Sequence, residues 1–378
     1  MYTRKRTFST IDNSRARIIL SPGKAEDEKI VAKSGRIVVA LSGGVDSSVT
    51  ARILQKSGWQ VVGATLLLRP GVTEPDPALA RFCAAHDIEL HAVPAAAEFA
   101  SRVLIPAAHE YDRGRTPNPC CECNELLKFA LLEKFAREVG ADALATGHYC
   151  VADGGALRRG RDLAKDQSYF LYRLKREILP FLRFPLGELT KPEVREIARA
   201  EHLECAERPD SQDVCFAVPG ECCGDTLLRA SGVPPRPGNV IFDGRIVGRH
   251  GGIHRCTVGQ RGGLGVALGV PAYVKRIDGT SGEVELCTDR AELACHSFTL
   301  SRLNWQQPPP VPGSELEIQI RYRSRPARCR VYPEGENCRI ETNEPLFAVT
   351  PGQAGVIYEN DLLLGGGVIG SPDPQQRK

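Results

Sequence analysis

Residues 36–48 read Arg-Ile-Val-Val-Ala-Leu-Ser-Gly-Gly-Val-Asp-Ser-Ser, and this stretch decides the fold. A short apolar run rich in β-branched residues breaks into a Ser-Gly-Gly turn, and the chain then restarts as a helix. The two glycines let the backbone approach a phosphate closely, and the serine hydroxyls beside them can donate to phosphate oxygens. The residues concerned are Ser42, Gly43, Gly44, Ser47 and Ser48. The stretch therefore predicts a strand, a nucleotide-binding loop and a helix whose N-terminus faces an anion.

Asp46 makes this prediction more specific. A carboxylate repels phosphate unless a divalent cation sits between the carboxylate and a leaving pyrophosphate, so Asp46 predicts Mg²⁺ and ATP cleaved between its α- and β-phosphates. The patterns G-x-x-x-x-G-K-[ST] and G-x-G-x-x-G are absent from this stretch, which argues against an ordinary kinase, GTPase or nicotinamide enzyme. The motif S-G-G-x-D-S resembles that of the PP-loop ATP pyrophosphatases. Short Ser-Gly turns also occur without a ligand, but the strand before this one and the helix after it favour nucleotide binding.

The composition is that of a globular protein of 378 residues with a net charge of +3, a charge too small to prove nucleic-acid binding by itself. No uncharged run approaches the roughly 20 apolar residues of a membrane span, and the start of the chain has no apolar signal-peptide core. These features predict a cytoplasmic protein with a disordered extension over residues 1–35. Fourteen cysteines in such a chain predict thiol or metal chemistry at some positions, with most of the thiols inert in the core.

The chain alternates short apolar strands with helical segments from residue 36 to about 215, which predicts a parallel α/β sheet covered on both faces. Strands are expected at 36–41, 60–68, 89–93 and 143–146, with helices through residue 54, near 78–86, through 109 and over 125–139. The carboxyl ends of the strands, where ligands of such sheets bind, fall at Ser42, Leu66 and residues 146–148. Beyond residue 219 short strands broken by Gly and Pro predict small β modules, and the last of them has the pattern of a small barrel.

A second informative segment, residues 114–124, reads Gly-Arg-Thr-Pro-Asn-Pro-Cys-Cys-Glu-Cys-Asn and precedes the expected helix. Cys123 would then lie near the helix N-terminus, where the macrodipole lowers a thiol pKa, so Cys123 is a candidate nucleophile or metal ligand. Cys215 is an isolated thiol in a polar loop. Taken alone, a Cys beside a Phe is more often a small buried hydrophobe.

Together these segments resemble one family, the tRNA-specific 2-thiouridylases, or MnmA family. The resemblance runs from residue 37 nearly to the end of the chain, through a series of separated motifs in one order. They are Thr-Pro-Asn-Pro at 116–119 with Cys123-Asn124, Ala-Thr-Gly-His-Tyr at 145–149, Lys-Asp-Gln-Ser-Tyr-Phe at 165–170, Phe-Pro-Leu-Gly at 184–187, Asp210-Ser211 with Cys215-Phe216, Thr-Val-Gly-Gln-Arg at 257–261, Gly-Leu-Gly at 263–265, Arg-Tyr-Arg at 321–323 and Thr-Pro-Gly-Gln at 350–353. The resemblance implies a PP-loop domain of the adenine nucleotide alpha hydrolase-like kind at 36–219, a small central domain at 220–295 and a C-terminal β-barrel at 296–378.

By that resemblance, ATP adenylates C2 of the wobble uridine of tRNA, and sulfur then displaces AMP to give 2-thiouridine. The position matching Cys215 carries a persulfide delivered by a sulfur relay, and the position matching Cys123 completes the transfer and leaves a disulfide. The sulfur donor is expected to be a sulfur relay, a cysteine desulfurase or free sulfide. The remaining matched positions have three roles. Nucleotide contacts fall on Ser42, Gly43, Gly44, Val45, Asp46, Ser47, Leu66 and Gly147; base contacts on Asn118 and Pro119; and tRNA contacts on Lys165, Asp166, Gln167, Arg321 and Tyr322. Leu66 stands where many members have Met.

One departure from the family pattern concerns Cys120, which stands where the family usually has Asp after Thr-Pro-Asn-Pro. Cys120, Cys123 and the remote Cys215 form a three-thiolate set of the kind that can hold a [4Fe–4S] cluster with one iron open for sulfide. Related PP-loop sulfur transferases are similar in using such a cluster. The sequence thus leaves a persulfide route and a cluster route open, and it also leaves open whether Cys120, Cys121 or neither joins the active thiols.

Two other functions also remain open at this stage. A PP-loop ligase or amidotransferase would explain residues 42–47 but would give Cys123, Cys215 and the β modules no role. A catalytically idle tRNA-binding protein would keep the scaffold without the chemistry. Loss of thiolation on replacing Cys123 would exclude the first, and pyrophosphate release stimulated by tRNA would exclude the second.

Overall fold

The computed structural model describes residues 34–209, 214–217 and 220–370. Its first domain contains a sheet of five parallel strands in the order β3-β2-β1-β4-β7. The strands are β1 (Ser34–Ala40), β2 (Trp59–Leu67), β3 (Glu89–Pro94), β4 (Ala143–Ala145) and β7 (Leu182–Arg183). The predicted parallel sheet is confirmed, and its order reverses between β1 and β4, where such sheets bind ligands. All but the last two residues of the predicted extension, 1–35, lie outside the described residues.

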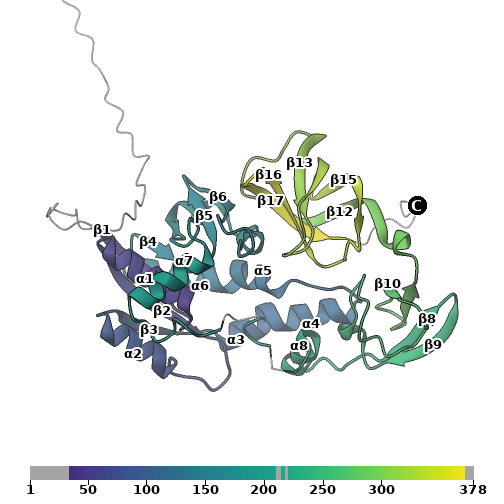
Figure 1. Ribbon diagram of the computed structural model, residues 1–378, viewed down its shortest axis with the longest axis horizontal. Coiled ribbons are helices and arrows are strands. Elements are labelled where there is room, and N and C mark those ends of the chain that lie inside the picture. The colour runs from purple at the N-terminus through teal and green to yellow at the C-terminus, as the bar shows by residue number, and fades with distance from the viewer. Residues whose placement is uncertain (1–33, 210–213, 218–219, 371–378) are drawn as a thin grey trace, which may run out of the picture. The chain divides into compact units, whose positions relative to one another are not determined.

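Alternate residues of β1 enter two separate cores. Ile37 and Val39 pack into the core that includes α1 (Val45–Lys56), whereas Val38 packs into the core that includes α6 (Phe129–Glu138). Side chains of a strand alternate between its faces, so a strand buried on both faces has this pattern. Figure 1 shows α7 (Lys191–Ala200) beside α1, and the two helices share a core of their own.

Two helical runs of this domain contain π turns. The first runs through α3 (Ala96–Phe99), η1 (Ala100–Leu104) and α4 (Ile105–Asp112), and the second through α5 (Pro119–Cys123), η2 (Asn124–Lys128) and α6. The prediction that the second helix begins at 125 was wrong, because Asn118 caps the backbone N–H of Cys121 and Pro119 occupies the first helical position. Pro is favoured at that position since its fixed φ suits a helix and its missing N–H would be unpaired there.

Short elements complete the first domain. They are α2 (Pro77–Ala85), β5 (Cys150–Asp153), β6 (Ala156–Arg159), η3 (Ser168–Leu171) and η4 (Arg176–Phe181). The hairpin β5–β6 continues the sheet of the C-terminal barrel through the pairing of Arg158 with Leu362. The first domain and the barrel are therefore joined by backbone pairing as well as by side chains.

The central region begins with α8 (Cys223–Ser231), which packs on α4. A four-stranded sheet follows in the order β10-β11-β8-β9. Its elements are β8 (Gly238–Phe242), β9 (Arg245–His250), η5 (Ile253–Arg255), β10 (Tyr273–Ile277) and β11 (Val284–Cys287). The predicted small β module is confirmed.

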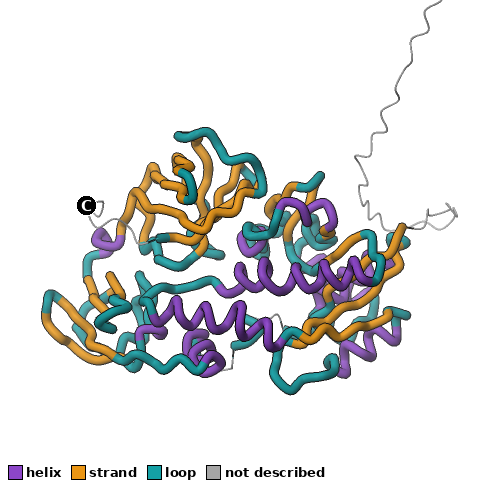
Figure 2. Tube along the Cα trace, turned by 180° about the vertical axis from the view of Figure 1, so that it is seen from behind, coloured by secondary structure: helices purple, strands orange, loops and turns teal. Residues whose placement is uncertain are grey.

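The last region is a closed barrel, as the sequence predicts. After η6 (Arg290–Leu293) come β12 (Ala294–Trp305), β13 (Ser314–Gln319), β14 (Ala327–Glu334), β15 (Asn337–Phe347), β16 (Ala354–Glu359) and β17 (Leu362–Ile369). The sheet runs β12-β15-β14-β13-β16-β17 and closes by pairing β12 with β17. Figure 2 shows the strands of the chain in orange and the loops between them in teal. β13 ends at Gln319, and Arg321 lies in the loop that follows. No helix in the described residues is long and apolar enough to cross a membrane.

Candidate functional site

The loop after β1 is organised by its own serines. The hydroxyl of Ser47 donates to the carbonyl of Gly44 at 3.0 Å and lies 3.2 Å from the hydroxyl of Ser42, while the backbone N–H of Ser42 donates to Ser47. Gly43 has a φ of +76°, a conformation that L side chains rarely adopt. Gly44 caps α1 without a side-chain bond. The loop thus directs the N-terminus of a twelve-residue helix toward the carboxyl edge of the sheet, as an anion site requires.

Gly147, which follows β4, packs directly against this loop. A Cβ at Gly147 would lie 2.9 Å from the backbone carbon of Asp46 and 3.0 Å from the backbone nitrogen of Ser47. Such contacts are too close for a real side chain, so only glycine lets the two turns meet. The structure therefore brings Gly147 together with residues 42–47, as expected.

Asp46 is held by two partners that the sequence analysis did not identify. Lys191 Nζ lies 2.7 Å from Asp46 Oδ1, and the hydroxyl of Tyr149 donates to the same oxygen at 2.9 Å. The Lys191 side chain is only 9% exposed, whereas that of Asp46 is 34% exposed. The pair balances the charge of Asp46 and leaves its carboxylate accessible from the loop side. A buried cation beside a phosphate loop cannot be recognised from Lys191 alone, since nothing in its local sequence distinguishes it.

The thiol centre is assembled from segments far apart in the sequence. Cys123 is buried in a cluster with Phe99 and Leu227, and Leu66, Phe216 and Cys223 pack against this cluster. The Phe216 ring lies 5.9 Å from that of Phe99, which fixes the residue next to Cys215. Lys128 lowers the pKa of both Cys120 and Cys123, and Cys215 raises it, so these groups lie within electrostatic range of one another. Leu66, at the carboxyl end of β2, thus lies between the nucleotide edge and the thiols.

The expected lowering of the Cys123 pKa by a helix dipole was wrong. Burial raises the pKa of Cys123, while the Lys128 ammonium and a backbone N–H of Lys128 oppose that rise. Because the helix begins at Pro119, Cys123 is its fifth residue and lies beyond the first turn, where the dipole acts. The π turn η2 is what brings Lys128 to the thiol, and π turns of this kind are frequent at functional sites.

The other two thiols differ in exposure. Cys215 is exposed and Cys120 is half-buried. Burial raises the pKa of Cys120 to about 12 and also raises that of Cys215, and Lys128 opposes the shift in both. Ten of the fourteen cysteines are buried, which agrees with the expectation that most are inert core thiols. Cys215 is not the buried hydrophobe that its neighbour Phe216 alone would suggest.

The segment before Cys120 is the meeting point of all three described domains. From the barrel, Pro351 accepts the backbone N–H of Thr116 at 2.9 Å, and Gln353 Nε2 donates to the carbonyl of Thr116 at 3.0 Å. From the central domain, Thr257 Oγ1 lies 3.3 Å from Thr116 Oγ1. These contacts hold the segment that ends in Asn118 and Pro119. Asn118 is half-buried and Pro119 is buried beside the thiols.

The predicted tRNA residues 165–167 lie together, but two of them serve the fold. Asp166 is buried and its carboxylate accepts the backbone N–H groups of Gly160 and Ser168 and pairs with Arg159 at 3.1 Å. Gln167 Oε1 accepts the backbone N–H of Tyr149 at 3.1 Å. Both therefore position other residues, and the half-buried Lys165 is the member of the set with a cationic head.

Arg321 and Tyr322 also differ from one another. Arg321 Nη2 donates to the carbonyls of Val258 and Ala348 and to the hydroxyl of Thr350, so it joins the barrel to the central domain. Tyr322 is half-buried and its ring lies 4.3 Å from that of Phe170. The aromatic pair presents a surface on which a base can stack, whereas the Arg321 guanidinium is used internally.

Comparison with known proteins identifies related sequences. Residues 35–219 match the family model described as tRNA methyl transferase HUP domain, residues 228–288 its PRC-barrel domain, and residues 295–369 the aminomethyltransferase beta-barrel domain. The tRNA-specific 2-thiouridylase MnmA of Synechococcus sp. strain RCC307 is 41% identical over 88% of this chain and 93% of its own length. MnmA 1 of Syntrophus aciditrophicus is 39% identical over 93% of this chain and 97% of its own length.

A solved structure of a 4-thiouridine synthetase–RNA complex with bound ATP shows a weak likeness, with a TM-score of 0.33 and 20% identity. The match covers 52% of this chain and 50% of that one.

Proposed function

The chain belongs to the tRNA-specific 2-thiouridylase family, and we propose that it converts the wobble uridine of tRNA to 2-thiouridine with ATP, releasing AMP and pyrophosphate. The whole-length relatives carry a thiouridylase name, whereas the family models carry a methyltransferase description. The reaction assignment follows the whole-length relatives, because a phosphate loop joined to a thiol centre suits sulfur transfer. The observation that carries the proposal is this junction: Leu66 packs against the cluster that holds Cys123 and stands at the nucleotide edge of the sheet.

In the first step, the loop of residues 42–47 binds ATP, and the O2 atom of uridine attacks the α-phosphate. The backbone N–H groups and hydroxyls of the loop stabilise the negative charge that develops as pyrophosphate leaves. Asp46 would hold a magnesium ion, because its carboxylate is partly exposed beside the loop and Mg²⁺ is often bound by one protein carboxylate together with substrate phosphates. When bound, the ion supplies Lewis-acid stabilisation of the leaving group.

In the second step, the terminal sulfur of a persulfide on Cys215 attacks C2, and AMP leaves with the former O2. The Cys123 thiolate then attacks the Cys215 sulfur, the sulfur–sulfur bond breaks toward the base, and C2 keeps the transferred atom as a thiocarbonyl. A disulfide between Cys123 and Cys215 remains, so an external dithiol must reduce it before another turnover. Exposure of Cys215 suits loading by a protein persulfide donor, and burial of Cys123 protects the thiol that forms the disulfide.

The cluster route is less well supported by these residues. Within residues 34–209, 214–217 and 220–370, no group of three or more His, Cys, Asp or Glu side chains is arranged to hold a metal ion. Cys120, Cys123 and Cys215 are neighbours but do not form such a group, so no step is assigned to an iron–sulfur cluster. We keep the persulfide pair as the sulfur carrier.

The uridine is placed by the segment that ends in Asn118 and Pro119, and the surrounding anticodon by Lys165, Tyr322 and the surfaces that flank them. A base held beside Cys123 must be unstacked from the anticodon, and sequence-specific RNA recognition favours such splayed bases. Asp166, Gln167 and Arg321 support this surface from within. We place the reaction in the cytoplasm, where ATP and tRNA meet.

The proposal is tested by incubating the full chain with ATP, magnesium, a dithiol, a cysteine desulfurase with cysteine as persulfide source, and unmodified tRNA, and measuring 2-thiouridine by nucleoside mass spectrometry. A matched tRNA with cytidine at position 34 is the control. Thiolation and AMP formation with uridine 34 only are expected. Pyrophosphate release without tRNA, or equal release with both tRNAs, would point instead to another adenylated acceptor.

A further inference from the structure

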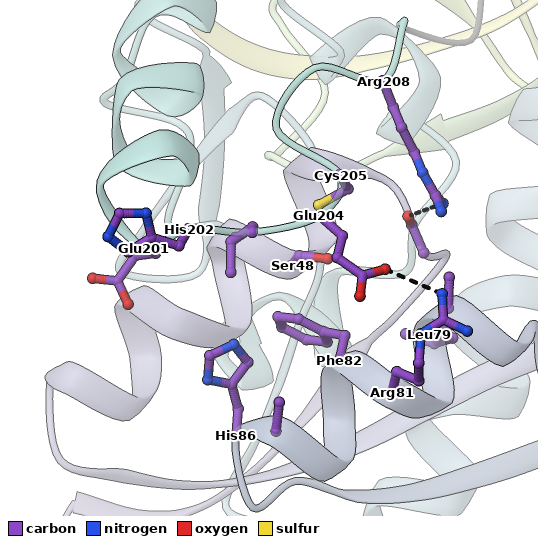
Figure 3. Close-up of a pocket in the computed structure, with 14 residues that line it drawn as sticks. Ser48, Leu79, Arg81, Phe82, His86, Glu201, His202, Glu204, Cys205 and Arg208 are labelled. Carbon is purple, nitrogen blue, oxygen red and sulfur yellow. Dashed lines mark hydrogen bonds and ion pairs between the residues drawn. The ribbon is translucent and has the colours of Figure 1, made fainter.

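Arg208 lies beside the phosphate loop and has no carboxylate partner among the described residues. Its Nη1 donates to the carbonyl of Gly43 at 3.3 Å, as Figure 3 shows. A carbonyl is a weak partner for a guanidinium, which binds phosphate through parallel, charge-assisted hydrogen bonds. The contact therefore keeps the Arg208 side chain at the loop, where a phosphate oxygen can replace the Gly43 carbonyl as its hydrogen-bond partner.

The acidic residues around Arg208 are neutralised by other cations. A cavity of about 230 Å³ adjoins the loop, and Glu201, Glu204, Arg81 and Arg208 are among its lining residues (Figure 3). Glu204 pairs with Arg81 at 3.1 Å, and Glu201 pairs with Arg52 at 2.8 Å and also with Lys56. Arg208 is thus the cavity cation whose charge remains available to an anion.

The backbone of Arg208 is bonded to α7, which packs on the helix that follows the loop, α1. Arg195 of α7 donates to the carbonyl of Ala206 at 2.7 Å and to that of Arg208 at 3.0 Å. Cys205 and Ala206 are buried in the core that also contains Val45 of α1. The exposed side chain of Arg208 therefore starts from a fixed point, which reduces the entropy lost when it binds a ligand.

We propose that Arg208 binds the pyrophosphate portion of ATP and the pyrophosphate that cleavage releases. This inference rests on the proposed function, since it assigns a further substrate contact at the same loop. Lys191 is already paired with Asp46 at 2.7 Å, so Arg208 is the side chain beside the loop that can add positive charge to that of magnesium. Arg208 does so by exchanging the Gly43 carbonyl for phosphate oxygens, and it stabilises the charge that grows on the leaving group.

The test measures binding of magnesium pyrophosphate alone to the full chain by isothermal titration calorimetry. Arg208→Gln is expected to raise the Kd at least tenfold, and Arg208→Lys, which keeps the charge without the planar fork, about threefold to tenfold. The matched control is Arg81→Gln, which removes the other arginine of the cavity and should change the Kd less than twofold. The inference is overturned if folded Arg208→Gln protein binds magnesium pyrophosphate with a Kd within twofold of that of the unaltered chain. If Arg208→Gln does not fold, an unchanged Kd for Arg208→Lys overturns it instead.

A second measurement separates this inference from the proposed function. The unaltered chain is assayed for pyrophosphate release from ATP with uridine-34 tRNA, and pyrophosphate is then added as a product inhibitor. Arg208→Gln should weaken product inhibition in parallel with the calorimetric Kd. If the unaltered chain releases no pyrophosphate, the proposed function fails while the calorimetric comparison still decides the role of Arg208.

Discussion

The phosphate loop and the thiol centre are built in opposite ways. The loop is local: Ser42, Gly44 and Ser47 lie within six consecutive residues and bond to one another. The thiol centre draws Cys123 from the middle of a helix and Cys215 from a segment about ninety residues further on. The loop offers hydrogen-bond donors to an anion, whereas Cys123 lies among apolar side chains, and its burial raises its pKa. Because the two regions are built from different residues, we expect mutations in the loop to impair adenylation and mutations of the thiols to impair sulfur transfer.

The largest effect is expected from Cys123→Ser. Sulfur transfer should fall below detection, because a serine hydroxyl cannot attack the Cys215 sulfur and form the disulfide. The rate of tRNA-dependent pyrophosphate release should stay within about threefold of that of the unaltered chain. Nucleoside mass spectrometry and a pyrophosphate assay on the same sample check both outcomes. Cys121→Ser is the control, because Cys121 lies two residues before Cys123 and is also buried, but its thiol is directed to the carbonyl of Tyr169. Equal loss of sulfur transfer and pyrophosphate release in Cys123→Ser would show that mutation does not separate the two steps.

The next effect concerns the loop itself. Asp46→Asn should lower tRNA-dependent pyrophosphate release on the order of 100-fold, as removal of one charge-stabilising group does in other enzymes. The control is Arg52→Met, which breaks the ion pair between α1 and Glu201, the residue that follows the last residue of α7. Arg52→Met should lower the melting temperature by a few degrees and leave the turnover rate within threefold. Similar rates for the two variants would mean that the Asp46–Lys191 pair only joins helices.

A smaller effect is expected from Lys128→Met. Lys128 lowers the pKa of Cys123 against the effect of burial, so removing the ammonium raises that pKa further. The thiolate fraction at a given pH then falls, and the pH profile of Cys123 alkylation moves to higher pH. Alkylation at neutral pH should slow several-fold, as peptide mass spectrometry can measure. Lys128→Arg should retain the original pH profile. An unshifted profile in Lys128→Met would show that Lys128 does not lower the pKa of Cys123.

The smallest effect is expected at the aromatic surface. Tyr322→Ala should raise the KM for tRNA about fivefold, since stacking of one base is worth roughly 1 kcal/mol or more. Tyr322→Phe keeps the ring and is expected to bind tRNA normally. Arg321→Ala should instead lower the melting temperature, because its guanidinium bonds to backbone carbonyls of two domains. A tRNA defect in Arg321→Ala without any loss of stability would reverse these assignments.

The sequence predicts well what is encoded locally. The alternation of short strands and helices, the glycine turn of residues 42–44 and the barrel pattern each depend on near neighbours, and all appear in the structure. Gly147 was also expected at the nucleotide edge, and its close approach to Asp46 gives a steric reason for glycine there. These features depend on backbone conformation and periodicity, which a single sequence displays directly.

The features that the sequence does not reveal depend on long-range packing. The pairing of Lys191 with Asp46 joins residues 145 positions apart, and the contact of Arg208 with Gly43 spans 165. The Cys123 pKa was predicted in the wrong direction because desolvation depends on which distant side chains surround the thiol. Asp166 and Arg321 look like surface contacts in the sequence, yet both are satisfied by internal partners.

The central claim is that the Cys215 persulfide donates its terminal sulfur to the base and that Cys123 releases this sulfur by forming a disulfide with Cys215. The most direct measurement is a single turnover with metal-free protein carrying a persulfide on Cys215, mixed anaerobically with ATP, magnesium and unmodified tRNA. The account predicts one 2-thiouridine per persulfide together with a disulfide between Cys123 and Cys215, identified by peptide mass spectrometry. Product that forms only after reconstitution of an iron–sulfur cluster, or without that disulfide, would contradict it.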